Sequence, residues 1–486
     1  MKVVMFTEGT YPFVRGGVST WCQHLISGLS EITFDVYAVI GTPEGRTEYT
    51  LPPNVRKLIP LAMWGVESLH EYNREFLPAH PRRNTLALRT EFLPLFRDFL
   101  HNVAYGMESS DPQALGEILA ALYLYFRVHD YDWTMRQDAT WAAALEFLCE
   151  QAWHARFMTM LEAIEVVRTL YRYLMPLAIE LPEADVYHAS ASGLASVPSI
   201  VAKYALKKPV LLTEHGVYLR ERILALARGG FPLSDRTIKK NLFSAFARAS
   251  YQASDVIAPV CSYNTRWESF YGVRSDRLHI VYNGVDSTLF SDQDYWPARP
   301  TVVSVARIDP LKDILTLIAA SAELRKLVPG VLVEVWGPSP DPDYRRECER
   351  LIDEFALRDT VQLRGPTEDP AAAYAHSHVA VLSSISEGFP FSVIEALMCA
   401  KPVVATDVGG VREAVGDNGT IVPPRRPDRL AEALAVFLKD QELARATGKR
   451  GREFAVEHFD RSVFLSRYRQ LYHTLAAGAA EVRRAG

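Results

Sequence analysis

The feature that most constrains the fold of this chain is an alternation of buried strands and amphipathic helices, which occurs in two separate series. The first series opens with a strand at 2–7, a glycine turn and helix at 16–29, and a second strand at 34–40. Such βαβ units build open parallel sheets that are covered by helices on both faces. The pattern therefore predicts doubly wound α/β domains, in which ligands bind at the carboxyl ends of the strands.

The domain organisation follows from where this alternation is interrupted. Two prolines within 295–301 mark a linker between the two series. We predict an N-terminal Rossmann-like domain at 1–294, a C-terminal one at 295–458, and a last helix at 459–486 that returns to the first domain. Between about 64 and 180 the pattern is helical and rich in leucine and aromatic residues, which predicts a helical insertion packed on the first domain. Its aromatic residues indicate a buried core rather than a carbohydrate platform.

Composition and charge exclude several classes of protein. The 486 residues carry a net charge of −5, and no basic run points to a nucleic-acid partner. No apolar stretch reaches the roughly 18 to 20 residues of a membrane span. The five cysteines are scattered and lack metal-ligand spacing. We expect a reduced, cytoplasmic protein, able to lie against the inner face of the membrane, without structural zinc.

One stretch, 383–398, runs from a polar turn directly into an apolar-periodic helix. Gly388 allows the backbone to bend, and Pro390 suits the first helical position. The amide groups and dipole at a helix N-terminus favour phosphate. Glu387 and Glu395 are therefore better ligands for hydroxyl groups than for the phosphate, and a ligand with both chemistries would suit the stretch. The alternative is an ordinary surface helix with a proline start.

Other polar residues fall at the predicted carboxyl ends of strands in the first series. His188 and His215 each end a strand, and Gly16 and Gly17 lie in the loop after the first strand. A structural role for both histidines and a simple tight turn at the glycines are the alternatives.

Two acid-x-acid segments, 130–132 and 341–343, imitate a metal motif. Both stand in turn-like contexts, so we predict loops there and no metal site.

Taken together, these motifs resemble the retaining GT-B glycosyltransferases of glycosyltransferase family 4. The matching segments are Gly16-Gly17-Val18, 281–286 with Phe290, 305–312, Gly337-Pro338, 387–395 and Gly409-Gly410. The resemblance covers 1–42 and 185–475, which is all but the helical insertion. More narrowly, the segments 8–18 and 213–222 and the aromatic insertion look like the PelF-type enzymes of Pel exopolysaccharide synthesis in biofilms.

The resemblance implies two Rossmann-like domains that face each other across a cleft, with a nucleotide-sugar donor held mainly by the second. Arg307 and Lys312 would bind the donor diphosphate, and two cations within one turn can neutralise leaving-group charge. Glu387 would contact the sugar hydroxyls and Glu395 the ribose.

A histidine of the first domain would touch the donor sugar in such enzymes. We favour His215 over His188, because Ser190 stands where some relatives have a second histidine. The remaining donor-binding residues implied are Gly16, Gly17, Gly337, Gly388, Phe389, Phe391 and Ser392.

The predicted function is transfer of a hexose or N-acetylhexosamine from a UDP-sugar to a growing exopolysaccharide or lipid-linked acceptor. We expect no bound cofactor and no required metal, and membrane polysaccharide synthase subunits as partners. Retention could arise by same-face attack or by double displacement with Glu387 as nucleophile; a hydrogen-bonding role for Glu387 is favoured. The alternatives are a GT-B sugar phosphorylase or epimerase, and a non-catalytic scaffold.

Overall fold

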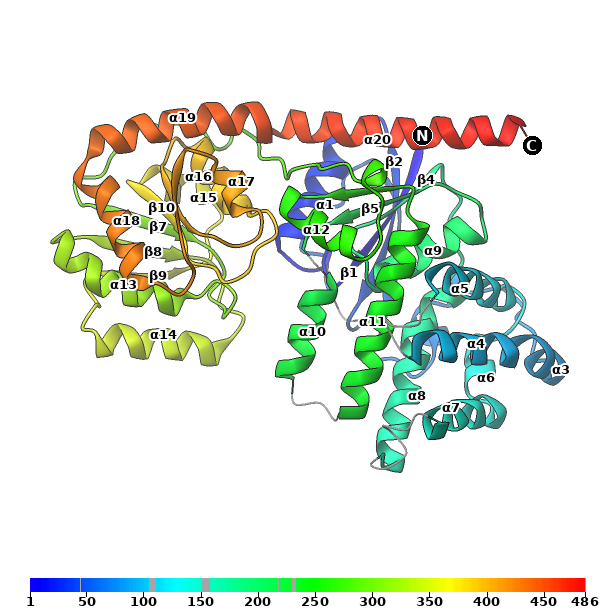
Figure 1. Cartoon of the computed structure of the whole chain (residues 1–486). Helices are drawn as coiled ribbons and strands as arrows, with labels where there is room; N and C mark the ends of the chain where they lie inside the picture. The colour runs from blue at the N-terminus through cyan, green and yellow to red at the C-terminus, as the bar shows by residue number, and fades with distance from the viewer. Residues whose placement is uncertain (44, 105–110, 151–157, 217, 230–232, 486) are drawn as a thin grey trace. The chain divides into compact units, whose positions relative to one another are not determined.

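The computed structural model describes residues 1–43, 45–104, 111–150, 158–216, 218–229 and 233–485, with the side chains of 228, 233–235 and 479–485 left aside (Figure 1). The chain forms two compact units. The first comprises 1–259, 265–279 and 468–486, and the second comprises 260–264 and 280–467. Residues 280–294, which the sequence assigned to the first domain, therefore pack with the second unit.

The first unit is built on a six-stranded sheet with the order β3-β2-β1-β4-β5-β6. All neighbouring strands pair in parallel. Two strands on one side of the first and three on the other is the doubly wound arrangement, with a change of direction beside β1. The strands are β1 Lys2–Glu8, β2 Thr33–Ile40, β3 Val55–Ala62, β4 Val186–Ala189, β5 Val210–Glu214 and β6 Val256–Pro259.

Two strand assignments differ from the sequence pattern. The edge strand β3 was missed, because Arg56, Lys57 and Pro60 interrupt its apolar residues. An edge strand tolerates both proline and charge, and Arg56 pairs with the buried Asp35 on β2 at 2.9 Å. The apolar residues of 278–286 also predict a strand, and this prediction is wrong, since the segment forms only isolated bridges at Leu278 and Val285.

The helical insertion lies between β3 and β4. Helices α4, α5 and α8 pack against α11 of the same unit (Figure 1). Phe92, Phe96 and Phe99 are at most 1% exposed and join the core that contains Phe6 of β1. The aromatic residues of the insertion therefore serve as core, as predicted. The helices are α2 Leu69–Tyr72, α3 Thr85–Ala87, α4 Leu93–Ala104, α5 Pro112–Phe126, α6 Tyr131–Met135, α7 Asp138–Glu150 and α8 Met160–Leu174.

The other helices of the first unit flank its sheet. They are α1 Gly17–Gly28, α9 Val197–Tyr204, α10 Tyr218–Arg228, α11 Leu233–Ala253 and α12 Ser262–Phe270, the last of which begins in residues of the second unit.

The second unit repeats the same topology, with the order β12-β11-β10-β7-β8-β9. Its first strand, β7, again lies inside the sheet between β10 and β8. The strands are β7 Thr301–Val305, β8 Leu332–Trp336, β9 Val361–Gly365, β10 Val379–Leu382, β11 Val403–Thr406 and β12 Gly419–Val422. The helices are α13 Ile314–Leu327, α14 Pro342–Glu354, α15 Pro370–Ala375, α16 Phe391–Met398, α17 Val411–Val415, α18 Pro427–Lys439, α19 Gln441–Phe459 and α20 Arg461–Ala485.

Helix α20 contributes to both units. Its residues from Tyr468 onward belong to the first unit, where Arg469 pairs with Glu31 at 2.8 Å. Tyr468 and Tyr472 are fully buried in that unit. The C-terminal helix therefore packs on the first unit from Tyr468 onward.

Candidate active site

The turn after β7 carries the first predicted cation. Arg307 donates from Nε to Asp309 at 3.0 Å, and its side chain remains 51% exposed. The other oxygen of Asp309 accepts from the backbone N–H groups of Leu311 and Lys312, at 3.0 and 3.1 Å. Asp309 thus holds the backbone of the turn through one oxygen and orients the Arg307 guanidinium through the other. Sequence reasoning quoted this residue within a motif without giving it a role.

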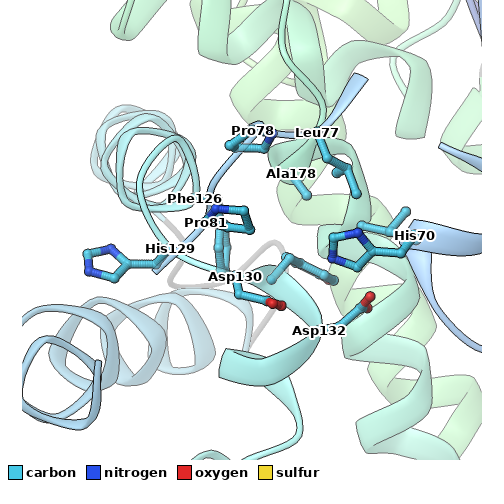
Figure 2. Close-up of a pocket in the computed structure, with 11 residues that line it drawn as sticks. His70, Leu77, Pro78, Pro81, Phe126, His129, Asp130, Asp132 and Ala178 are labelled. Atoms are coloured by element: carbon cyan, nitrogen blue, oxygen red, sulfur yellow. The ribbon is translucent and has the colours of Figure 1, made fainter. Parts of the chain in front are cut away.

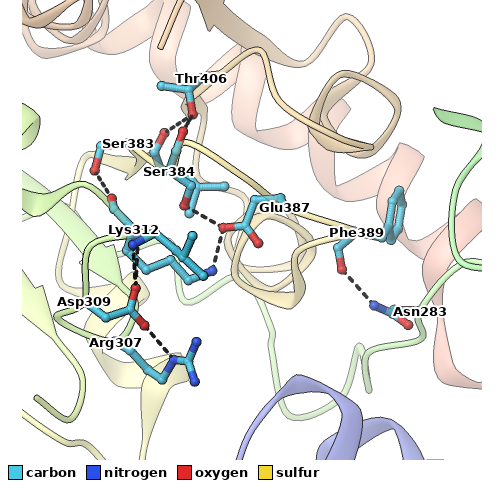
Figure 3. Close-up of polar contacts among 11 residues, drawn as sticks. Asn283, Arg307, Asp309, Lys312, Ser383, Ser384, Glu387, Phe389 and Thr406 are labelled. Carbon is cyan, nitrogen blue, oxygen red and sulfur yellow. Dashed lines mark hydrogen bonds and ion pairs between the residues drawn. The ribbon is translucent and has the colours of Figure 1, made fainter. Parts of the chain in front are cut away.

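The second cation meets the first of the two predicted carboxylates. Lys312 Nζ lies 2.5 Å from Glu387 Oε1, and Ser384 Oγ donates to the same oxygen at 2.5 Å (Figure 3). Ser383 binds the Lys312 carbonyl at 2.8 Å, and Thr406 binds the Ser384 carbonyl at 2.6 Å. The side chains of Lys312 and Glu387 are only 20% and 9% exposed. Three strand ends, those of β7, β10 and β11, therefore hold one ion pair.

The polypeptide that follows Glu387 packs directly against the glycine turn after β11. Gly409 has a φ of +55°, and a Cβ there would lie 1.9 Å from the Glu387 carbonyl oxygen. Gly410 donates its N–H to the Gly388 carbonyl at 2.8 Å. Only glycine permits this approach at position 409. The Gly409-Gly410 pair thus sets where the backbone of Glu387 and Gly388 runs.

Helix α16 begins beside this loop, at Phe391. Pro390 is the N-cap rather than the first helical residue as predicted, and no side chain among the described residues caps the helix. Phe391 and Ser392 form its first turn, where backbone N–H groups and the dipole favour an anion. Phe389, by contrast, is 4% exposed and its ring serves as core.

Glu395 lies one turn further along α16. Tyr374 has its hydroxyl 3.2 Å from Glu395 Oε2 and 3.0 Å from the Ser392 carbonyl. Burial raises the pKa of Glu395 to about 7, because the charged form loses hydration there. The carboxyl group can therefore change its charge near neutral pH.

A glycine at the end of β8 closes the same side of the sheet. Gly337 has a φ of +159°, and a Cβ there would lie 2.0 Å from the Ala306 carbonyl oxygen. Its N–H donates to the Gly365 carbonyl at 2.8 Å. The missing side chain lets β8 approach the backbone just before Arg307. The predicted donor-site residues of the second unit thus all lie at or beside the carboxyl ends of its strands. They are Arg307, Lys312, Gly337, Glu387, Gly388, Phe389, Phe391, Ser392 and Glu395.

In the first unit, the predicted glycines form the start of α1. Gly16 is the N-cap in extended backbone, without a side-chain cap, and a Cβ there would meet open space. Among the residues described in this unit, no neighbouring atom requires glycine at position 16. Gly17 is the first helical residue.

His215 follows the last residue of β5. Its Nε2 is buried without a hydrogen-bond partner among the described residues, and the ring meets Trp21 edge-on at 4.7 Å. Burial lowers the pKa of His215 to about 3, so the imidazole is neutral at physiological pH. A neutral ring with an unused nitrogen is suited to a hydrogen bond with a ligand hydroxyl.

His188, the other candidate, is fully buried on β4. Both ring nitrogens have partners: Nδ1 lies 2.7 Å from the Tyr472 hydroxyl and Nε2 lies 2.8 Å from the Thr213 hydroxyl. Burial holds the pKa of His188 well below its usual range. These contacts tie the sheet to helix α20 and leave neither nitrogen available to a ligand in this conformation.

Sequence reasoning gave no site role to Glu8, at the end of β1. Its Oε1 accepts from the Tyr218 hydroxyl at 2.9 Å and from the Arg222 guanidinium at 2.7 Å. Both partners lie on α10, and the guanidinium stacks on the Tyr218 ring at 4.9 Å. This cluster places a carboxylate and a cation at the sheet edge that also carries His215.

The helical insertion offers no comparable site at the cavity in Figure 2. That cavity, lined by His70, His129, Asp130 and Asp132 among others, has a volume of about 10 Å³. Such a space holds at most one water molecule. Asp130 caps α6 and Asp341 caps α14, so the two acid-x-acid segments are helix starts rather than the predicted loops.

Comparison with known proteins identifies the two halves of the chain. Residues 1–276 match the family described as "Domain of unknown function (DUF3492)". The chain belongs to this family. Residues 292–454 match "Glycosyl transferases group 1". The chain therefore carries a glycosyltransferase domain, in agreement with the predicted class of enzyme.

Three curated relatives match part of the chain. The MMP alpha-(1->4)-mannosyltransferase of Mycolicibacterium hassiacum is 28% identical, over 52% of this chain and 62% of the relative. The alpha-maltose-1-phosphate synthase of Mycolicibacterium smegmatis is also 28% identical, over 55% and 74%. An exopolysaccharide phosphotransferase of Streptomyces coelicolor is 30% identical over 48% of this chain, but over only 24% of its own length.

Solved structures establish the fold. HepE of Anabaena, crystallised with UDP, has a TM-score of 0.61 at 15% identity and matches 98% of this chain and 100% of its own. Sucrose-phosphate synthase of Thermosynechococcus elongatus has a TM-score of 0.60 at 18% identity, over 98% and 99%. Together with the two parallel sheets, these likenesses show the predicted GT-B fold with two Rossmann-like domains. Within the described residues, no helix has the length and apolar character that a membrane crossing requires.

Proposed function

We propose that this protein transfers a hexose or N-acetylhexosamine from a UDP-sugar, with retention of configuration, to a growing exopolysaccharide or a lipid-linked acceptor. The observation that carries the proposal is the ion pair of Lys312 and Glu387 at 2.5 Å, beside Arg307 and the first turn of α16. The arrangement combines positive charge for a diphosphate with carboxylates for hydroxyl groups. HepE, with the same fold, was crystallised with UDP and with UDP-glucose.

In the proposed reaction, the bond between the sugar C1 and the β-phosphate oxygen breaks, and UDP leaves with the bonding electrons. The acceptor hydroxyl oxygen forms the new bond to C1 on the same face, and its proton passes to the departing β-phosphate oxygen. Arg307 and Lys312 neutralise the charge that develops on the diphosphate, which is the main electrostatic demand of this step. The half-exposed Arg307 guanidinium, already oriented by Asp309, has donors left for phosphate oxygens. These two cations supply the charge that a metal ion would otherwise provide, so we propose that no metal is required.

The other residues hold the donor. The first turn of α16, Phe391 and Ser392, meets the phosphate through backbone N–H groups. Glu395 binds the ribose hydroxyls and Glu387 the sugar hydroxyls. Gly337 and Gly388 let the backbone approach the nucleotide.

His215 donates or accepts one hydrogen bond to the donor sugar through Nε2, which has no hydrogen-bond partner among the described residues. His188 has a packing role in this proposal, although the sequence also made it a candidate. Gly16 and Gly17 are proposed to contribute the start of α1 to the diphosphate.

Retention is expected to arise by same-face attack rather than by double displacement. Glu387 already accepts two hydrogen bonds, from Lys312 and Ser384, on one oxygen. A carboxylate committed in this way is a weaker nucleophile than a free one. The acceptor class rests on the motifs that look like PelF-type enzymes, and the Streptomyces coelicolor relative is also named for exopolysaccharide. Membrane synthase subunits stay proposed partners.

The test is titration of the purified chain with UDP, GDP and ADP by calorimetry, followed by incubation with the matching hexose donors in the presence and absence of EDTA. We expect UDP to bind, Glu395→Ala to weaken that binding by about tenfold, and UDP release to be unaffected by EDTA. Unchanged UDP affinity in Glu395→Ala would refute the donor-site assignment. Sugar 1-phosphate as product would indicate a phosphorylase, a free epimerised sugar an epimerase, and absence of turnover with every acceptor a scaffold.

A further inference from the structure

The chain passes between its two units at a few short segments, and each of these segments contacts the loop that follows Glu387. The first is 260–264, which belongs to the second unit while both of its neighbours belong to the first. The second begins at Ile280, and the third ends at Arg467 on helix α20. All contacts described below lie within the second unit.

The first segment meets Gly388. Cys261 is fully buried, and its Sγ lies 3.6 Å from the Gly388 carbonyl oxygen. The next two residues, Ser262 and Tyr263, donate their backbone N–H groups to Glu413 at 2.7 and 2.8 Å. Glu413 lies on α17, immediately after the Gly409-Gly410 turn that supports the Glu387 backbone.

The second segment meets Phe389. Asn283 donates from Nδ2 to the Phe389 carbonyl at 2.7 Å, and both side chains are 4% exposed (Figure 3). The neighbouring Tyr282 stacks on the Phe389 ring with centroids 4.8 Å apart. This hydrogen bond from the Asn283 amide is the strongest single contact to the loop. Without it, the buried Phe389 carbonyl would have lost its hydration with no donor to replace it, which costs the full desolvation free energy of the group.

The third segment closes around the same ring. Phe459, the last residue of α19, lies edge-on to Phe389 at 5.2 Å. Its carbonyl accepts from the Val285 N–H at 2.9 Å, and Arg461 returns a backbone bond to the Val285 carbonyl at 2.9 Å. Gly284 has no room for a side chain, since a Cβ would lie 2.5 Å from Phe464.

We propose that these connecting segments position the donor-site loop, and that Asn283 is the principal positioning residue for Glu387 and for the start of α16. The role given to Glu387 rests on the proposed function. The physical reason is local. The Phe389 carbonyl belongs to the peptide that leads into Pro390 and α16, two residues after Glu387. Fixing that carbonyl, together with the Gly388 carbonyl, restricts the conformations of the backbone between them.

The decisive test does not depend on activity. Backbone hydrogen exchange of the full chain is measured over peptides that cover 385–392, in the wild type and in Asn283→Ala. We expect exchange there to accelerate about threefold to tenfold, the range for loss of one buried hydrogen bond. The matched control is Asn54→Ala, because Asn54 also donates its amide to backbone carbonyls, those of Ile26, Leu29 and Ile32, but in the first unit. That variant should leave 385–392 unchanged.

A second readout separates positioning from stability. UDP meets the start of α16 but lacks the sugar that Glu387 is proposed to hold. Asn283→Ala should therefore weaken UDP binding by no more than about threefold, while kcat for UDP-glucose hydrolysis falls about tenfold, as expected for a displaced contact. Asn283→Asp, which keeps the size but cannot donate to the carbonyl, should behave alike. A purely structural role would lower the melting temperature and leave kcat of the folded enzyme unchanged.

The inference is overturned by unchanged exchange at 385–392 in Asn283→Ala, by an equal change in Asn54→Ala, or by an unchanged kcat in folded Asn283→Ala. If Asn283→Ala does not fold, Cys261→Ala removes the weaker tie to Gly388 and should give a smaller acceleration at the same peptides; no acceleration there also overturns it. Failure of the wild type to bind UDP would instead refute the proposed function, and the exchange result would stand by itself.

Discussion

Replacing Gly409 with alanine tests directly whether the glycine turn after β11 sets the position of Glu387. A Cβ at position 409 would lie 1.9 Å from the Glu387 carbonyl oxygen and 2.7 Å from its carbon. To reach even 3.0 Å from that oxygen, the two atoms must separate by about 1.1 Å. The positive φ of +55° adds a backbone cost of about 1–2 kcal/mol, and residual overlap adds about 1–3 kcal/mol.

The matched control is Gly330→Ala in the same unit. Gly330 has a φ of +80°, and a Cβ there would have no atom within 4 Å. This variant therefore carries the backbone cost alone. Chemical denaturation should show a loss of about 2–5 kcal/mol for Gly409→Ala and about 1–2 kcal/mol for the control.

The effect on activity distinguishes displacement from instability. A shift of about 1 Å at a group that contacts the reacting substrate can cost on the order of a hundredfold in rate. We expect kcat for release of UDP from a UDP-sugar to fall by that order in Gly409→Ala and to stay within about twofold of wild type in Gly330→Ala, both measured well below their melting temperatures. If both variants are folded and equally active, the glycine turn does not position Glu387 and the reasoning is refuted.

The remaining predictions concern charge and burial at the two strand edges. Because the pKa of Glu395 is raised to about 7 by burial, UDP affinity should rise as pH increases from about 6 to 8 and the carboxylate forms. Calorimetry should show that Glu395→Gln loses most of this dependence. The same raised pKa means that ionised Glu395 opposes folding, so wild-type stability relative to Glu395→Gln should decline as pH rises from 4.5 through 7. A double-mutant cycle with Lys312→Met and Glu387→Gln should give a coupling free energy of about 1–3 kcal/mol by denaturation. The double variant should be more stable than Lys312→Met, because the single variant leaves a buried carboxylate unpaired. Additive effects would contradict the pairing. His188→Ala should cost about 2–4 kcal/mol, because two buried hydroxyl groups lose their partner, whereas His215→Ala should lower kcat with a smaller loss of stability; the reverse order would exchange their roles.

Much of this fold could be predicted from local sequence patterns. Buried strands followed by amphipathic helices predicted the two doubly wound domains, because side-chain periodicity reports directly on which face is buried. The edge strand β3 escaped prediction, since its charges and Pro60 are tolerated only because it has a partner on one side. The segment 278–286 looked like a strand, but its residues Asn283 and Val285 serve contacts to other parts of the chain instead.

The candidate site divides in the same way. The sequence by itself placed Arg307, Lys312, Glu387 and Glu395 at strand ends and a helix start, because ligand sites in parallel sheets follow from the direction of the strands. It could not show that Lys312 and Glu387 form one ion pair, since they are 75 positions apart and only the order of β7 beside β10 brings them together.

Tertiary structure also decided between residues that look alike in sequence. His188 and His215 both lie near the carboxyl ends of strands, yet helix α20 covers the first and supplies its partner Tyr472, while Nε2 of the second has no partner among the described residues. Asn283 and Gly409 act through contacts with backbone carbonyl groups, and no local sequence pattern identifies them. Their importance depends on which carbonyl group lies next to them, and only the folded structure determines that.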